Sequence, residues 1–170
     1  ESLTAYYNFY KDSLPQKTVN EYNIKGVNLN LGKHEIKLSG KLDRLELKPN
    51  SPAVTVVDYK TGAAKSRNEI LGNTKNADGN YFRQLVFYKL LLDSLPNKKY
   101  NMLAGAIDFT EPDDKNRFKR EIFEISTDHT KELKETIAKC TDEILNLKFW
   151  NKFCGEKDCG YCELRRLIKS

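Results

Sequence analysis

The stretch AVTVVDYKTG, residues 53–62, decides the fold because a nearly unbroken apolar run ends there in an acid and a lysine. Ala53–Tyr59 is rich in β-branched residues, which is typical of a strand covered on both faces. We therefore expect this strand at the centre of a β-sheet. Burying Asp58 and Lys60 beside valines costs several kcal/mol unless each is paired or metal-bound, so their position indicates a functional pair.

Periodic segments on either side of this strand predict the other elements. In chain order, we expect a helix over Ser2–Leu14, three antiparallel strands within Thr18–Leu47 with turns near Gly26 and at Leu31–Lys33, a polar loop over Gly62–Gly79, a helix over Phe82–Leu95 ended by Pro96, a hairpin of Met102–Phe109 and Phe118–Ile125, and a final helix from Thr127 or Asp128 to Leu147. This order predicts an α/β fold with a central mixed β-sheet flanked by helices.

The composition fits one domain over residues 1–170, because 170 residues with 39% hydrophobic residues can bury one sizeable core. No stretch approaches the ~20 apolar residues of a membrane span, and none resembles a secretion signal. We therefore expect a cytoplasmic protein without a membrane partner. The net charge of +5 fits a polyanionic partner but is also common in other soluble proteins. Because the chain begins with Glu1 rather than Met, we expect a C-terminal part of a larger protein.

An acid two residues before a lysine on a strand places both side chains on one face. The acid can hold a divalent ion and the ammonium can orient water or offset charge, as hydrolysis of a phosphodiester requires. The sequence holds five such triplets: Glu35–Lys37, Glu46–Lys48, Asp58–Lys60, Asp113–Lys115 and Glu132–Lys134. Only the third ends an apolar run, and the other four are expected to display solvated charges.

Asp43 is the second candidate ligand, on the strand expected to pair with the strand of Asp58. Two carboxylates can then face one ion. The residues alone leave an equal alternative, in which Asp43 pairs with Arg44 at the surface and Asp58 caps the following turn.

Three motifs in this order resemble the motif series of RecB-type nucleases of the PD-(D/E)XK superfamily. They are GKLDR at residues 40–44, VVDYKTG at residues 56–62, and Gln84-Leu85 with Tyr88. The resemblance covers Gly40–Tyr88 closely and Cys159–Arg166 more loosely. It implies a restriction-endonuclease-like fold and a metal-dependent DNA nuclease. It also implies Mg²⁺ or Mn²⁺ as cofactor, and a helicase domain or subunit as partner in DNA repair or recombination.

The resemblance also implies roles for individual residues. Asp43, Asp58 and the Tyr59 carbonyl would be metal ligands, and Lys60 would be the catalytic lysine. Gln84 and Tyr88 would line the site, and their spacing of four residues places them on one helix face. Without the resemblance, a helix whose polar atoms only satisfy their neighbours is the commoner meaning.

RecB-type nucleases usually carry a further histidine or acid upstream of these motifs. Glu21 is the one match in this sequence. His34 and His129 are more typical of surface histidines than of metal ligands.

The C-terminal tail, residues 148–170, combines basic residues with Cys154, Cys159 and Cys162, and Cys140 lies one helix earlier. Some relatives in this nuclease group close an iron–sulfur cluster with such a tail. Here Ile168 stands where their final cysteine falls. The incomplete pattern favours free thiols over a zinc ion or an iron–sulfur cluster.

Two hypotheses from other classes stay open beside the nuclease. One is a nuclease-like module that binds DNA or serves as a scaffold without cutting, which the missing upstream ligand favours and the intact Asp43, Asp58 and Lys60 oppose. The other is a protein-interaction domain stapled by zinc, which elemental analysis would reveal.

Overall fold

The computed structural model describes residues 2–148, 150, 152–156 and 158–168. The elements are α1 (Ser2–Tyr10), β1 (Thr18–Asn30), β2 (Glu35–Leu47), β3 (Ala53–Lys60), α2 (Arg67–Leu71), α3 (Asn80–Asp93), β4 (Asn101–Phe109), β5 (Arg120–Glu124), α4 (Thr127–Leu145) and α5 (Gly160–Ile168). The chain divides into two compact units, Glu1–Lys134 and Glu135–Ser170, which are described separately. No helix among the described residues is both long and apolar enough to cross a membrane.

The first unit is built on one five-stranded sheet in the order β1-β2-β3-β4-β5. β3 therefore lies at the centre, as its β-branched sequence predicts. β3 and β4 are parallel, with α2 and α3 in the connection between them, and the other neighbours are antiparallel. The predicted mixed sheet flanked by helices is confirmed, as is the antiparallel hairpin of β4 and β5.

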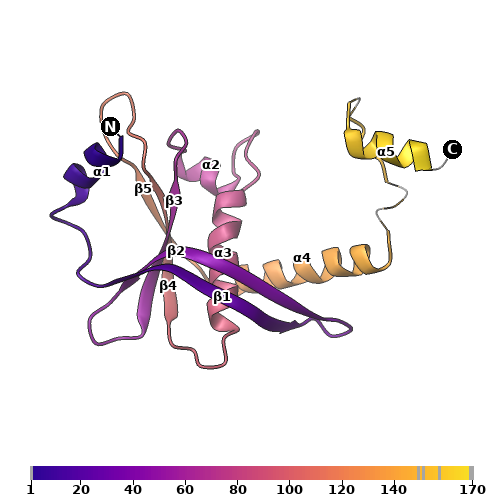
Figure 1. Ribbon diagram of the computed structural model, residues 1–170, viewed down its shortest axis with the longest axis horizontal. Coiled ribbons are helices and arrows are strands. Elements are labelled where there is room, and N and C mark those ends of the chain that lie inside the picture. Colours follow the sequence, from indigo (N-terminus) through magenta and orange to yellow (C-terminus); the bar gives the residue numbers. More distant parts are fainter. Residues whose placement is uncertain (1, 149, 151, 157, 169–170) are drawn as a thin grey trace. The chain divides into compact units, whose positions relative to one another are not determined.

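The segment Thr18–Leu47 forms two long strands, so the prediction of three was wrong. Gly26 has a φ of +62° and marks a shift in the β1–β2 register between Ile24 and Val27. It is a β-bulge, which bends a strand without ending it. The predicted turn at Leu31–Lys33 is present. Only Arg44–Leu47 of β2 pair with β3, so most of the β1–β2 hairpin extends past the rest of the sheet (Figure 1).

The core lies between the sheet and α3, which Figure 1 shows running along one face. α3 is apolar on several sides, and its Leu85, Leu91 and Leu92 are fully buried. Two sheet glycines allow the helix to approach. A Cβ on Gly40 would lie 2.5 Å from Leu91 Cδ1, and one on Gly105 would lie 3.0 Å from three atoms of Leu85. Close packing of this kind fixes the helix against β2 and β4, the two neighbours of β3.

The helices differ from their predicted bounds at several ends. α1 ends at Tyr10 instead of Leu14, and α3 begins and ends two residues earlier than predicted. The region predicted as a polar loop over Gly62–Gly79 contains α2, whose buried Ile70 joins the core. Ser66 and Glu69 form a capping box at its start, which satisfies backbone N–H groups that a short helix leaves free.

The second unit contains most of α4 and all of α5. The helix α5 was not among the elements predicted from the sequence. Arg165 and Arg166 lie over the Phe153 ring, with guanidinium carbons 4.5 Å and 5.8 Å from its centroid. Lys148 forms an ion pair with Asp142. Several basic side chains of the tail thus have partners within the second unit.

Candidate active site

Four of the predicted site residues form one hydrogen-bonded network at the C-terminal end of β3. Lys60 Nζ lies 2.7 Å from Asp58 Oδ2. Gln84 bridges the two residues: its Oε1 accepts from Lys60 Nζ at 2.8 Å, and its Nε2 donates to Asp58 Oδ1 at 2.7 Å. Since an ammonium only donates and a carboxylate only accepts, this orientation of the Gln84 amide is the one that satisfies both partners.

Tyr88 completes the network from the next turn of α3. Its hydroxyl donates to Asp58 Oδ1 at 2.8 Å and lies 2.6 Å from Gln84 Nε2. Burial, followed by the nearby charge of Asp58, raises the pKa of Tyr88 well above its ordinary value of 10.0. Tyr88 therefore stays protonated and acts as a hydrogen-bond donor to Asp58 throughout the neutral range.

The Asp58 carboxylate is almost completely buried, with its side chain 3% exposed. A buried carboxylate is costly unless its charge is offset. Lys60, Gln84 and Tyr88 provide that offset. One oxygen, Asp58 Oδ2, still has no well-aligned hydrogen bond among the described residues, although the Lys60 ammonium lies beside it.

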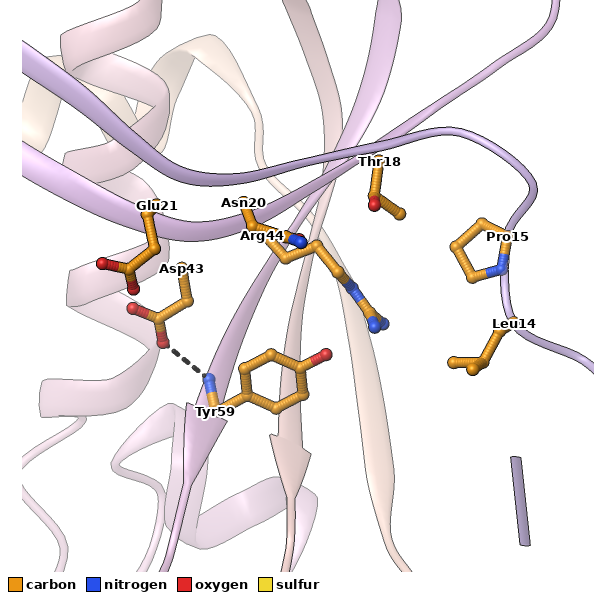
Figure 2. A pocket seen from close by; sticks show the side chains of 8 residues that line it. All are labelled: Leu14, Pro15, Thr18, Asn20, Glu21, Asp43, Arg44 and Tyr59. Carbon is orange, nitrogen blue, oxygen red and sulfur yellow. Dashed lines mark hydrogen bonds between the residues drawn. The ribbon is translucent and has the colours of Figure 1, made fainter. Parts of the chain in front are cut away.

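Asp43 reaches the same strand end from β2. The β2–β3 pairing ends at Arg44 and Val57, so the next position along the register places Asp43 opposite Asp58. There Asp43 Oδ2 accepts a 3.0 Å hydrogen bond from the Tyr59 backbone N–H, as Figure 2 shows. The contact holds the Asp43 carboxylate next to the backbone that carries Asp58 and Lys60.

A pocket of about 400 Å³ opens beside Asp43. Figure 2 shows the residues that line it: Leu14, Pro15, Thr18, Asn20, Glu21, Asp43, Arg44 and Tyr59. Asn20 pairs with Arg44 and Tyr22 with Leu42, so the register places Glu21 opposite Asp43. Glu21 has a left-handed backbone, with a φ of +56°, and forms an ion pair with Lys41. The metal role of Glu21 stays a prediction.

The residues present fit a divalent cation that prefers oxygen ligands. Asp58 Oδ2 is a buried carboxylate oxygen without an aligned donor, and Asp43 supplies a second carboxylate beside it. Mg²⁺ and Mn²⁺ favour such hard ligands. Asp43 and Asp58 are therefore the residues that would hold the ion. The structure brings Asp58, Lys60, Gln84 and Tyr88 into direct contact, while their catalytic roles stay predictions.

The Tyr59 side chain alternates with Asp58 and Lys60 and so points to the opposite face of the strand. The Arg44 guanidinium lies 5.1 Å from its ring centroid. On this face, Arg44 and Arg120 both donate to Glu46, at 2.5 Å and 2.6 Å. Tyr59, whose backbone carbonyl is the proposed metal ligand, thus packs its side chain against a second polar network.

Asp108 is a residue of this second network that sequence reasoning missed. It is fully buried, pairs with Tyr59 in the β3–β4 register, and accepts a 2.6 Å hydrogen bond from the Tyr6 hydroxyl. Burial raises the pKa of Asp108 above its ordinary value. The sequence pattern that singled out Asp58 could also have identified Asp108, because Asp108 is likewise an acid near the end of an apolar run.

In the second unit, Cys154, Cys159 and Cys162 lie together, with sulfur atoms within 4.8 Å of one another. Cys154 Sγ and Cys162 Sγ are 3.5 Å apart. The backbone N–H of Cys162, followed by the other two thiols, lowers the pKa of Cys159, which favours the thiolate that metal ions bind. Among the described residues, Cys140 is not part of this group and is exposed on α4. Three of the four predicted thiols are thus brought together.

Comparison with known families assigns the class of the protein. Residues 4–167 match the model of the PD-(D/E)XK nuclease superfamily, and this chain belongs to that superfamily. Membership indicates a nuclease, and members typically use divalent metals, which agrees with the two carboxylates at the end of β3. The mixed sheet flanked by helices is consistent with the restriction-endonuclease-like fold.

A solved structure titled "Crystal structure of SSO0001" is similar over 91% of this chain, with 17% sequence identity and a TM-score of 0.49. This chain spans 60% of that chain. No curated protein matches the sequence.

Proposed function

We propose that this chain is the RecB-like nuclease domain of a larger, cytoplasmic DNA-processing protein and hydrolyses DNA phosphodiester bonds with Mg²⁺ or Mn²⁺. The observation that carries the proposal is the Asp58 carboxylate, buried at the end of the central strand and contacted by Lys60, Gln84 and Tyr88. One oxygen of this carboxylate, Oδ2, has no aligned hydrogen bond among the described residues, and such a hard oxygen ligand suits a divalent ion.

The protein residues would divide the chemistry in the following way. A bound divalent ion supplies positive charge to the phosphate oxygens and lowers the pKa of water. Asp43 and Asp58 would hold that ion. Gln84 and Tyr88 fix the orientation of Asp58, and Gln84 also holds Lys60. The Lys60 ammonium then lies at a fixed place beside Asp58, where it can stabilise the charge that develops on the phosphate.

The helicase association and the role in DNA repair or recombination rest on the three RecB-type motifs. We propose that a helicase domain in the same polypeptide or complex delivers the strand to be cut. A pull-down with the full-length protein, followed by assays of DNA unwinding and cutting in the same complex, tests this part independently of the chemistry.

The cysteine group supports a further proposal, a metal site in the second unit. Three thiols with sulfur atoms within 4.8 Å supply three ligands of a zinc ion or of an iron–sulfur cluster. Elemental analysis of the purified protein, with absorption spectroscopy under anaerobic conditions, separates zinc, iron and neither. The Cys159→Ser variant should lose the bound metal.

The direct test of the nuclease uses labelled single- and double-stranded DNA. We expect cleavage with Mg²⁺ or Mn²⁺ and binding without cleavage with Ca²⁺, whose looser coordination misplaces the attacking water. Asp58→Asn should remove cleavage. If the wild-type protein binds DNA and cuts neither substrate with either metal ion, the chain is instead a DNA-binding module of the superfamily that does not cut.

A further inference from the structure

The Tyr81 ring, in the first turn of α3, is contacted by two ammonium groups. Lys60 Nζ lies 4.5 Å from its centroid and Lys65 Nζ lies 4.4 Å from it. Tyr81 packs against the buried Phe109, with ring centroids 6.4 Å apart. Cations are attracted to the face of an aromatic ring, so Tyr81 holds both lysines in one place.

The two lysines differ in whether a carboxylate pairs with their ammonium group. Both nitrogens lie within 4.5 Å of one ring centroid, so they are at most about 9 Å apart. Lys60 is paired with Asp58. Among the described residues, no carboxylate lies within ion-pair distance of Lys65. Lys65 therefore contributes a positive charge that no described carboxylate pairs with, and this charge can attract an anion.

The backbone that carries Lys65 is already anchored. Ser66 begins α2 with a capping box, in which its backbone N–H donates to Glu69 Oε2 at 2.7 Å. The other end of the segment is closed where Gly72 and Gly79 meet, because a Cβ on Gly72 would lie 2.9 Å from Gly79 N. The Lys65 backbone is therefore held in place near Lys60 before any ligand binds, and this lowers the entropic cost of ordering the segment on binding.

We propose that Lys65 and Tyr81 form a phosphate subsite beside Lys60, which binds the phosphate that neighbours the cleaved one on the same DNA strand. The inference rests on the proposed function, because Lys60 marks the cleaved phosphate. Each strand of a duplex carries one phosphate per ~3.4 Å of axis, so two lysines at most about 9 Å apart can contact successive phosphates. Lys65 binds the phosphate directly, and Tyr81 is a positioning residue.

The test uses charge variants in the same segment. Lys65→Gln removes the charge and keeps a polar side chain, and Lys65→Arg restores the charge. Lys75→Gln is the matched control, because Lys75 is an exposed lysine of the same segment. Binding of labelled DNA in Ca²⁺ is measured at about 50 and 200 mM salt. Losing one phosphate contact lowers the salt dependence, so the Lys65→Gln to wild-type ratio of Kd should shrink about threefold over this range.

A second measurement locates the phosphate. A neutral methylphosphonate is placed at each position around the bond that the wild-type protein cuts. The position next to the cleaved bond should slow the wild-type protein and should not slow Lys65→Gln any further, since the contact is already lost. Lys65→Arg should respond as the wild-type protein does. Tyr81→Leu should weaken binding in the same direction and leave the protein folded by circular dichroism.

The results separate the subsite from the nuclease. If Lys65→Gln equals Lys75→Gln in affinity and salt dependence, the subsite is wrong, whatever the cleavage activity. If the wild-type protein binds DNA without metal-dependent cleavage and Lys65→Gln still loses salt-dependent affinity, the subsite stands and the nuclease proposal fails. If the wild-type protein does not bind DNA, both fail.

Discussion

Replacing Lys60 by methionine removes its charge and keeps most of its length, so it separates the two tasks of this lysine. In the folded protein, Lys60 Nζ lies 2.7 Å from Asp58 Oδ2, and the two side chains are 18% and 3% exposed. Removing one partner of a buried ion pair costs about 3–5 kcal/mol. Gln84 and Tyr88 still donate to Asp58 in the variant, so we expect the lower end, about 3 kcal/mol.

The stability assay is urea unfolding in EDTA, so that no divalent ion replaces the lost charge. Asp58→Asn removes the carboxylate and serves as the second arm of a double-mutant cycle. In the Asp58→Asn background the Lys60→Met substitution leaves no buried charge unpaired. The loss in the free energy of unfolding that Lys60→Met causes should therefore be smaller there by about 2 kcal/mol than in the wild-type background. Equal costs in the two backgrounds would refute the argument that the ion pair stabilises the buried carboxylate.

The catalytic assay is single-turnover cleavage with Mg²⁺, beside DNA binding in Ca²⁺. If Lys60 stabilises the transition state, Lys60→Met cuts roughly a hundredfold more slowly and binds normally. If Lys60 mainly holds DNA, binding weakens and its salt dependence falls by about one phosphate contact. We expect the first result, because Lys60 is fixed by Asp58 and Gln84 at the end of β3. Unchanged cleavage would exclude a catalytic role.

Three further predictions concern packing, pH and thiol reactivity. Gly40→Ala places a Cβ 2.5 Å from Leu91 Cδ1 and should cost about 1–3 kcal/mol in urea unfolding, whereas Gly62→Ala meets nothing within 4 Å and should change little. Burial raises the pKa of Asp108, so the stability that its protonation contributes is fully present below the ordinary pKa and is lost as the pH rises through the raised pKa. Urea unfolding at several pH values should therefore show that Asp108→Asn becomes more stable relative to the wild-type protein as the pH rises above about 4. The pKa is lowered for Cys159 and raised for Cys154, so mass spectrometry of metal-free protein should find Cys159 alkylated before Cys154 at neutral pH.

Local sequence patterns were sufficient for the central strand and for the relative placement of the main polar residues. The β-branched run of Ala53–Tyr59 requires cover on both faces, and that is available only inside a sheet. Alternation places Asp58 and Lys60 on one face, and the spacing of Gln84 and Tyr88 places both on one side of α3. These features depend on residues near one another in the chain, and the structure contains each of them.

Contacts between distant segments were decided by the tertiary structure alone. A positive φ at Gly26 serves a turn or a bulge equally well, and only pairing with β2 makes it a bulge. Asp108 and Asp58 follow similar apolar runs, yet Asp108 binds Tyr6 on the opposite face. Lys65 lies in the predicted loop and Tyr81 lies just before the predicted helix, and no local pattern indicates that the two side chains are in contact. The periodicity of the sequence predicts the direction in which a side chain points from its own backbone. Which other side chains it contacts is determined only when distant segments of the chain fold together.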